Sequence, residues 1–336
     1  MVPFAAADRS VVVPESRDQP IDRATIDARL NDHARDAAGA FAPNTIRALA
    51  ADTRVFSAWC AGQGREALPA SPETVAAFVD AMAGVRAPAT VRRYCASIAS
   101  MHRAAGLVPP TAMQPAKLAL RRMARAKTTR QRQAEPLNRP ALDRMLAAVG
   151  QGAEPTAIAL RDAALAAVAY DTLLRRSELV SLYIEDLAPV SGEGTTILVR
   201  RSKTDQGGEG VVKFLAPDTV RALRAYLDAI GAPTHGPLFR PVTRWGRAAA
   251  KALEGQEVPR IFRKLAEAAG VRTARPHSGH STRVGAAQDM LAAGLELGEV
   301  MQAGSWKSVA MVARYGERLL ARRGAARKLA VLQNRA

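Results

Sequence analysis

Hydrophobic residues recur every three or four positions over most of the chain, which is the period of an amphipathic α-helix. In the first half this pattern predicts five helices. Ser71 is the expected N-cap of one helix, with Pro72 as its first residue, and Asn44 is the expected N-cap of another. The predicted helices span residues 21–38, 45–61, 72–84, 88–105 and 116–126.

The second half is also mostly helical, but it contains two β-branched stretches. They are residues 195–200 and 210–215, on either side of a glycine-rich turn, and they predict a β-hairpin. Helices are expected before and after this hairpin. They span residues 140–149, 156–174, 175–182, 218–230, 259–269, 281–293, 297–303 and 307–314, with a further short helix at 247–253.

These elements predict a mainly α protein of two domains, an N-terminal helical bundle and a C-terminal α+β domain with a small antiparallel sheet. A chain of 336 residues is long enough for each half to bury its own core. Residues 127–136 carry many charges without an apolar period, so they are expected to link domains at 20–126 and 137–336. Residues 1–19 also lack a period and are expected to form a mobile arm.

The composition indicates a polyanionic partner. Lys and Arg number 48 against 31 Asp and Glu, a formal net charge of +17, and the basic residues occur in both halves. A basic surface that only confers solubility is the competing interpretation. Cys60 and Cys95 are expected to be buried free thiols, which suits a cytoplasmic location. Because every apolar run is short, neither a membrane span nor a signal peptide is expected.

Candidate chemistry gathers in residues 275–315. His280 and Arg283 lie three positions apart at the start of a predicted helix, so their side chains can point to the same side. Trp306 follows the next predicted helix, and Tyr315 follows the one after it. Together these residues offer several donors to an anion and one hydroxyl nucleophile.

The sequence SGHSTRVGAAQDM, followed by EVMQAGSW and MVARY, resembles the C-terminal motif of the tyrosine site-specific recombinases of the phage integrase family. Residue types, spacing and helix breaks all agree, and the resemblance extends from about residue 20 to the end of the chain. It implies an enzyme that cleaves and rejoins DNA strands through a 3′-phosphotyrosine link, with neither a metal nor a nucleotide cofactor. It also implies that the two domains form a C-shaped clamp around double-stranded DNA.

Transfer of a DNA phosphoryl group requires positive charge near the non-bridging oxygens, an in-line nucleophile and an acid for the leaving oxygen. Arginine suits the first role because its planar fork donates two bonds to a phosphate and stays charged. Arg283 is one candidate, and Arg175, at a helix break in AYDTLLRRSELVSL, is the other. The resemblance implies that Glu178 braces the site, whereas Arg176 is expected to be a solvated neighbour. Leu173 stands where many relatives have glycine.

The resemblance implies four further roles. Lys203, on the turn of the predicted hairpin, would protonate the departing 5′ oxygen. His280 would bond a phosphate oxygen or act as acid and base, and the indole N–H of Trp306 would donate to the phosphate. Tyr315 would be the nucleophile, and nearby arginines would favour its phenolate. The competing interpretations are a solvated lysine, a structural histidine, a core tryptophan and a packing tyrosine.

A zinc site is not expected from the two neighbouring histidines. His277 and His280 could supply two ligands, but no further Cys or His cluster supplies the others. His277 flanks the motif at a position where the resemblance does not call for a histidine, so it is left out of the candidate site.

Basic residues on both domains are candidates for contacts with DNA. Arg92 and Arg93 are expected to face the major groove or the backbone, and Arg260 is the candidate for reading a base. Further basic residues on the helix at 116–126 are expected to contact phosphates, which fix register without reading sequence. They are Lys117, Arg121, Arg122 and Arg125.

Residues 318–332, beyond the proposed nucleophile, alternate leucines with basic residues. In the family such a tail helix docks onto a neighbouring protomer, which implies a homotetramer on two DNA sites, each with inverted repeats. A tail that folds back on its own domain is the alternative. The resemblance would place such an enzyme in the cytoplasm, with the nucleoid.

Two other functions compete with recombination. A type IB topoisomerase-like enzyme uses similar chemistry to relax supercoils without exchange, and the N-terminal bundle and tail helix argue against it. A catalytically silent DNA-binding protein is the second alternative, and it is disfavoured because every catalytic position is filled.

Overall fold

The computed structural model describes residues 22–127, 132–151, 154–190, 194–201 and 209–335. The predicted arm at residues 1–19 lies outside this part of the chain. The structure divides into two compact units, and the division falls between residues 131 and 132. Each unit has its own hydrophobic core.

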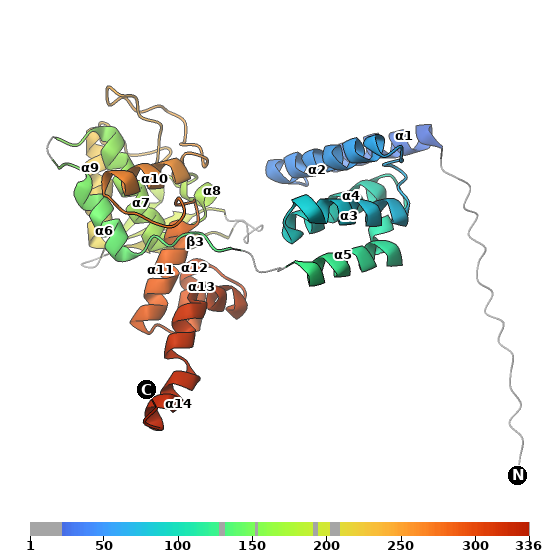
Figure 1. The fold of residues 1–336 in the computed structure, drawn as a ribbon. Helices are drawn as coiled ribbons and strands as arrows, with labels where there is room; N and C mark the ends of the chain where they lie inside the picture. The colour runs from blue at the N-terminus through green and yellow to red at the C-terminus, as the bar shows by residue number, and fades with distance from the viewer. Residues whose placement is uncertain (1–21, 128–131, 152–153, 191–193, 202–208, 336) are drawn as a thin grey trace, which may run out of the picture. The chain divides into compact units, whose positions relative to one another are not determined.

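Unit 1 is a bundle of helices (Figure 1). Ser71 caps its helix as predicted, since its Oγ accepts a hydrogen bond of 3.1 Å from the Thr74 N–H. The prediction of Asn44 as an N-cap is wrong. Pro43 is already helical and Ala42 is the N-cap, because the fixed φ of proline suits the first helical position. The elements are α1 (Arg23–Asp36), α2 (Pro43–Gly62), α3 (Pro72–Val85), α4 (Pro88–Ala104), the 3-10 helix η1 (Pro110–Ala112) and α5 (Gln114–Ala126).

Aromatic side chains dominate the core of unit 1. The ring of Phe78, on α3, lies 5.0 Å from that of Phe56 and 5.3 Å from that of Trp59, both on α2, in edge-to-face contacts. Cys60 and Cys95 are buried and free, as predicted. Burial raises the pKa of Cys95 to about 11, so this thiol behaves as a small hydrophobic residue.

Unit 2 is organised around one buried helix. The elements before the sheet are α6 (Arg139–Ala148), α7 (Ala157–Thr172), α8 (Arg176–Leu179) and the 3-10 helix η2 (Ile184–Asp186). Those after it are α9 (Pro217–Ala229), α10 (Val258–Ala268), α11 (Ser281–Ala293), α12 (Leu297–Gly304), α13 (Val309–Arg323) and α14 (Ala325–Leu332). Helix α7, rich in Ala and Leu, is buried along most of its length, as predicted, and contacts α9, α11, β3 and α10.

The sheet of unit 2 is antiparallel with the order β1-β2-β3, formed by β1 (Leu187–Val190), β2 (Gly194–Val199) and β3 (Val211–Leu215). The predicted hairpin is β2 and β3, while β1 was not predicted. Side chains alternate between the faces of β3, so Lys213 and Leu215 are buried and Val212 and Phe214 are exposed. The prediction of a mainly α fold with a small antiparallel sheet is confirmed.

The first residues of unit 2 are bonded to two of its helices. The Gln133 side chain donates to the carbonyl of Arg314 on α13, and the Leu137 N–H donates to the carbonyl of Ser281 on α11 at 2.9 Å. A Cβ atom on Gly285 of α11 would lie 1.9 Å from the Leu137 carbonyl oxygen. Glycine at position 285 therefore allows residues 132–138, the connecting segment, to lie directly on α11.

Two of the predicted helices differ from the structure. Residues 247–253 do not form a helix, because their backbone N–H groups bond elsewhere: Ala249 donates to Pro241 and Leu253 to Phe239, both at 2.8 Å. Helix α13 does not end at Tyr315 but continues to Arg323, so the proposed nucleophile lies within a helix.

Candidate active site

A sharp break between α7 and α8 places the first arginine of the site. Leu173, directly after α7, has a left-handed φ of 51° and is fully buried. This conformation is uncommon for a residue with a side chain. Two residues later Arg175 is the N-cap of α8.

Glu178 holds Arg175 through two hydrogen bonds. The backbone N–H of Arg175 donates to Oε2 at 2.9 Å, and its Nη1 donates to Oε1 at 2.8 Å. The Glu178 side chain is only 6% exposed, and that of Arg175 is 22% exposed. A buried carboxylate with this geometry fixes the direction of the guanidinium, as expected for a residue that braces the site.

Arg283, from the first turn of α11, is the second arginine of the site. It is 3% exposed, donates to the carbonyls of Leu173 and Gly304, and its guanidinium lies 4.6 Å from the centre of the Trp306 ring. Burial, followed by the charge of Arg175, lowers the pKa of Arg283 to about 10, so it remains charged at neutral pH. Tyr315 lies close enough for its side chain to act in the opposite sense on the pKa of Arg283 and raise it.

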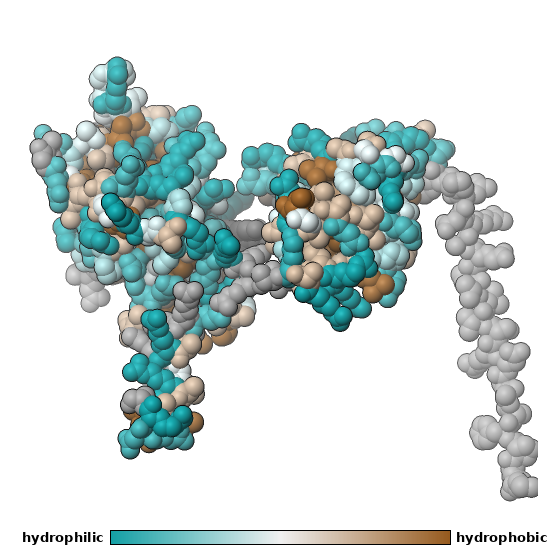
Figure 2. Space-filling view, in the orientation of Figure 1, coloured by the Kyte–Doolittle hydropathy of each residue, from teal (hydrophilic) through white to brown (hydrophobic). Residues whose placement is uncertain are grey.

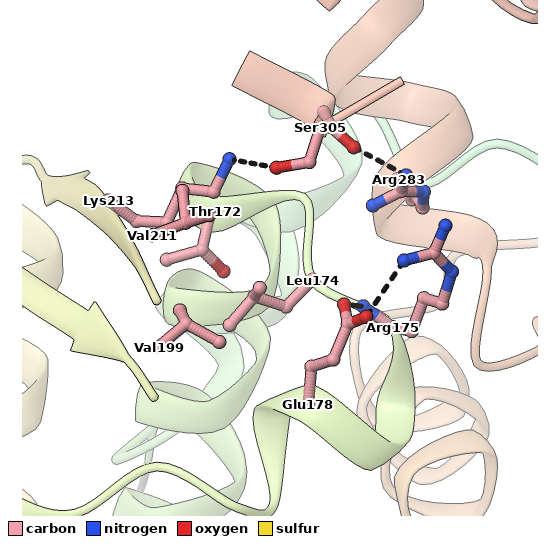
Figure 3. A pocket seen from close by; sticks show the side chains of 10 residues that line it. Thr172, Leu174, Arg175, Glu178, Val199, Val211, Lys213, Arg283 and Ser305 are labelled. Carbon is pink, nitrogen blue, oxygen red and sulfur yellow. Dashed lines mark hydrogen bonds and ion pairs between the residues drawn. The ribbon is translucent and has the colours of Figure 1, made fainter. Parts of the chain in front are cut away.

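The two arginines line a small enclosed cavity (Figure 3). Its volume is about 10 Å³, close to what one water molecule needs. Polar side chains from four separate segments of unit 2 reach this cavity. They are Thr172, Arg175, Glu178, Lys213, Arg283 and Ser305.

His280 precedes α11 as its N-cap, and its backbone N–H donates to Ser278 Oγ at 3.3 Å. Desolvation by the surrounding protein, and then the positive charges of Arg283, Arg175 and Arg176, hold the pKa of His280 below its usual value. A neutral imidazole has one donor and one acceptor nitrogen, so it can donate to an oxyanion and accept a proton.

Trp306, which precedes α13, and Tyr315, in the middle of α13, pack against each other. Their ring centres are 5.3 Å apart. Trp306 is 7% exposed in a core with Leu173, which supports the packing function that competed with hydrogen bonding. The Tyr315 carbonyl accepts a bond of 3.1 Å from the Gln288 side chain on α11, so α13 is fixed to α11 at the tyrosine.

The structure thus brings together six of the predicted catalytic residues from α7–α8, α11, the α12–α13 loop and α13. The prediction that Lys203 is a general acid lies outside the described residues. Sequence reasoning missed Lys213, which lines the cavity. The alternation of inward and outward side chains along β3 was the available signal, because Lys213 shares the inward face of the strand with Leu215.

The predicted DNA-binding residues are all exposed. Arg92 and Arg93 are on α4, and Arg93 forms an ion pair of 3.0 Å with the buried Asp52. Arg260, on α10, pairs with Glu257 at 2.7 Å. The remaining basic residues lie on α5: Lys117, Arg121, Arg122 and Arg125.

The described residues contain no group of three or more His, Cys, Asp or Glu side chains placed to hold a metal ion. Within the same residues, no helix has the length and apolar character needed to span a membrane.

Comparison with known proteins decides the family. The sequence profile of the phage integrase family matches residues 136–320, more than half of the chain. The chain belongs to the phage integrase family. It is 30% identical over 324 residues to the Cre recombinase of Escherichia phage P1, covering 91% of this chain and 93% of Cre. It is 33% identical over 286 residues to an integrase/recombinase, a XerD homolog, of Selenomonas ruminantium, covering 82% of each chain.

Solved structures of recombinases share the fold. A λ integrase dimer bound to a COC′ core site has a TM-score of 0.57 at 14% identity, covering 86% of this chain and 94% of that one. The Tn1549 transposon integrase in complex with circular intermediate DNA also has a TM-score of 0.57 at 14% identity, covering 85% and 94%. The predicted family is therefore confirmed, and the chain is a tyrosine recombinase, an enzyme that cleaves and rejoins DNA.

Proposed function

We propose that this recombinase cleaves DNA by attack of Tyr315 on a backbone phosphate held between Arg175 and Arg283. One observation carries the proposal: the buried guanidinium of Arg283 lies 4.6 Å from the centre of the Trp306 ring, which packs against the ring of Tyr315, and Arg175 lies close enough to lower the pKa of Arg283. A phosphate bound by both arginines would meet two fixed positive charges close to the Tyr315 hydroxyl. Such preorganised charge is the main source of stabilisation in phosphoryl transfer.

In the proposed reaction the Tyr315 oxygen forms a bond to phosphorus as the bond from phosphorus to the 5′ oxygen breaks. Arg175 and Arg283 stabilise the non-bridging oxygens, and Glu178 keeps Arg175 directed at them. The neutral imidazole of His280 donates to the same phosphate or accepts the phenolic proton. Lys203 gives a proton to the 5′ oxygen.

The products are a 3′-phosphotyrosine and a free 5′-hydroxyl. Because the phosphotyrosine keeps the energy of the broken bond, the 5′-hydroxyl of a second strand can attack it and regenerate the tyrosine. One pair of strands is exchanged when two phosphotyrosine links are each attacked by the 5′-hydroxyl of the other DNA. The charges in this scheme come from the protein, so it includes neither a metal nor a nucleotide.

Exchange between two DNA sites is favoured over relaxation of supercoils. The relatives that match along most of this chain are a recombinase and an integrase/recombinase. Among the similar structures, XerH is bound to a palindromic difH substrate, with a TM-score of 0.54 at 15% identity, covering 76% of this chain and 72% of that one. We therefore propose that the target is double-stranded DNA with inverted repeats, and that both units bind it in the cytoplasm.

Basic helices of both units are proposed to hold this DNA. The α5 residues would contact phosphates, and Arg92 and Arg93 the groove or the backbone. The side chain of Arg93 is fixed by Asp52, which is 2% exposed and also accepts a bond of 2.9 Å from Ser97. Arg260 is proposed to read a base once it leaves its exposed pair with Glu257.

The tail is proposed to join protomers into a tetramer. None of the residues of α14 is buried, and Leu329, Val331 and Leu332 are 50%, 51% and 81% exposed. Figure 2 shows hydrophobic atoms among hydrophilic ones at this end of the chain. Exposed leucine and valine side chains on a terminal helix suit burial in a neighbouring copy of the same protein.

The test of the nucleophile needs a DNA site, which can be selected from a random duplex library by binding to the Tyr315→Phe protein. A version of the selected site with a nick beside the cleaved phosphate traps the covalent adduct. The wild-type protein should form an adduct that survives a denaturing gel, and Tyr315→Phe should form none while binding DNA equally well. Tyr183→Phe is the matched control and should form the adduct normally. An adduct from Tyr315→Phe at the wild-type level would refute the assignment.

A further inference from the structure

Lys213 is a buried lysine that the proposed reaction does not use. It lies in the middle of β3, on the strand face that points into unit 2, and it is 7% exposed. Lysine is rarely buried to this degree unless its ammonium group has partners. Its position beside Arg175, Glu178 and Arg283 in the wall of the site cavity calls for a function.

The partners of Lys213 all belong to the end of α12. Its Nζ donates to the carbonyl of Ala303 at 2.5 Å, to Ser305 Oγ at 2.9 Å and, more weakly, to the carbonyl of Gln302 at 3.4 Å. An ammonium group has three N–H donors, so these three acceptors match its full capacity. The C-terminal end of a helix carries partial negative charge and unpaired carbonyls, which favour a cation there.

The same end of α12 fixes the catalytic arginine. The carbonyl of Gly304, between two of the Lys213 partners, accepts a bond of 2.6 Å from Arg283. Ser305, the C-cap, has a left-handed φ of 50°, and the next residue is Trp306, whose ring lies under the Arg283 guanidinium. The position of this turn thus sets where Arg283 points.

Gly304 is also held tightly by its surroundings. A Cβ atom at this residue would lie 2.1 Å from the Trp306 ring. The Trp306 ring therefore packs closely on Gly304 while the Lys213 ammonium bonds to the neighbouring residues, so the turn of residues 302–306 has little room for an alternative arrangement.

We propose that Lys213 is a positioning residue of the recombination reaction. By binding the end of α12 it holds the Gly304 carbonyl and Trp306 in the places that direct Arg283 at the phosphate. Lys213 also connects this turn to β3, the second strand of the hairpin formed with β2. The proposal rests on the function proposed above for Arg283.

Positioning differs from acid catalysis in a measurable way. A general acid becomes unnecessary when the leaving 5′ oxygen is replaced by sulfur, because a thiolate leaves without a proton. Loss of a positioning residue slows cleavage of both substrates by the same factor, since the arginine is displaced in either case. The oxygen and sulfur versions of the selected site therefore separate the two functions.

The experiment compares Lys213→Met with Lys203→Ala on both nicked substrates in single-turnover reactions. Methionine keeps the length and volume of the buried stem but makes none of the three bonds. Lys213→Met should slow adduct formation by about 10² on the oxygen substrate and by a similar factor on the sulfur substrate. Lys203→Ala should be slow only on the oxygen substrate. Lys264→Met, at a lysine outside the site, is the matched control and should react normally.

A double variant tests whether Lys213 acts through Arg283. Lys213→Met combined with Arg283→Ala should be no slower than Arg283→Ala alone, because the residue to be positioned is already gone. If Lys213→Met reacts as fast as the wild type, or if sulfur restores its rate, the positioning proposal is overturned.

A milder variant covers the case in which Lys213→Met does not fold. Ser305→Ala removes one of the three acceptors and should slow both substrates by roughly 3- to 10-fold, in keeping with loss of one hydrogen bond. If Lys213→Met does not fold and Ser305→Ala reacts at the wild-type rate, the proposal is contradicted. The Tyr315→Phe control is read separately: an adduct from that variant refutes the proposed function, whatever Lys213 does.

Discussion

The pair formed by Arg175 and Glu178 gives the sharpest prediction for catalysis. Glu178→Gln preserves the shape of the side chain but replaces one carboxylate oxygen by an amide NH2 group. In the wild type both carboxylate oxygens accept bonds from Arg175, at 2.9 Å from its backbone N–H and 2.8 Å from its Nη1. In the variant, a donor faces a donor at one of these two contacts.

The expected loss follows from this mismatch. A buried polar group left without its partner costs about 1–3 kcal/mol, and the Glu178 side chain is only 6% exposed. If Arg175 must return to its wild-type direction in the transition state, the cost appears in the activation barrier. Because about 1.4 kcal/mol corresponds to a tenfold change in rate, cleavage should slow by roughly 10- to 100-fold.

The assay is single-turnover adduct formation on the nicked substrate at saturating DNA. Glu185→Gln is the matched control: Glu185 also pairs with an arginine, Arg200, at 3.1 Å, but its side chain is 40% exposed. This variant should react within about twofold of the wild type, because exposed pairs contribute little.

Combination with Arg175→Ala decides whether Glu178 acts through the arginine. Arg175→Ala alone should cost about 10²–10³ in rate, the usual scale for loss of one transition-state donor. The double variant should be no slower than Arg175→Ala. If the two losses multiply, Glu178 acts on the reaction independently of Arg175 and the reasoning above is wrong.

Three further predictions concern stability and assembly. Gly285→Ala should lower the free energy of unfolding, measured by chemical denaturation, by more than about 2 kcal/mol, because the added Cβ would meet the Leu137 backbone. Gly298→Ala is the control: there is open space around Gly298, so this change should stabilise helix α12 by about 0.5–1 kcal/mol. Burial lowers the pKa of His102, so this side chain binds a proton more readily in the unfolded state, and stability should fall as the pH drops below about 6.5. The melting temperature of His102→Gln should depend less on pH in this range than that of the wild type. An equal pH dependence in the two proteins would contradict the prediction. A chain ending at Gly324 keeps α13 intact and should bind a single half-site but not form the four-subunit complex in sedimentation with DNA; full assembly would show that α14 is not the joining element.

Much of the fold could be predicted because local signals agree with it. Ser71 and Pro72 start α3 where the capping rule places them, and α11 spans residues 281–293 as its pattern predicts. The helix predicted at 247–253 shows the limit of this reasoning. Its sequence, rich in alanine, favours a helix, but its N–H groups bond to residues 239–241, and such tertiary contacts outweigh propensity.

Strand β1 and the position of Lys213 in the site were not predicted, and the two failures have a common explanation. Strand β1 has four residues, one of them Pro189, and shows no alternation of buried and exposed side chains, so it lacks the pattern that marks a strand. Lys213 could be placed on the inward face of β3, but its acceptors lie about 90 positions later in the chain. Pairings over such separations depend on the packing of whole elements, which one sequence does not reveal.

The candidate site was predictable to the extent that its residues form contiguous motifs. Arg283, Trp306 and Tyr315 fall in one run of the sequence, and the structure brings them into contact. The extent of burial was not predictable. Arg283 is 3% exposed and bonded to two carbonyls, so this proposed phosphate ligand is also part of the core.

The bonds between the connecting segment and the catalytic helices have a mechanical consequence. Tension applied to residues 132–138 enters unit 2 at the carbonyl of Arg314, the neighbour of Tyr315, and at that of Ser281, two residues before Arg283. Any pull from the N-terminal side therefore reaches α13 and α11 before the sheet or α9. Insertions ahead of Gln133 would lengthen the connection without disturbing these two bonds. A deletion that reaches Gln133 would remove the bond between the connecting segment and α13, the helix of the proposed nucleophile.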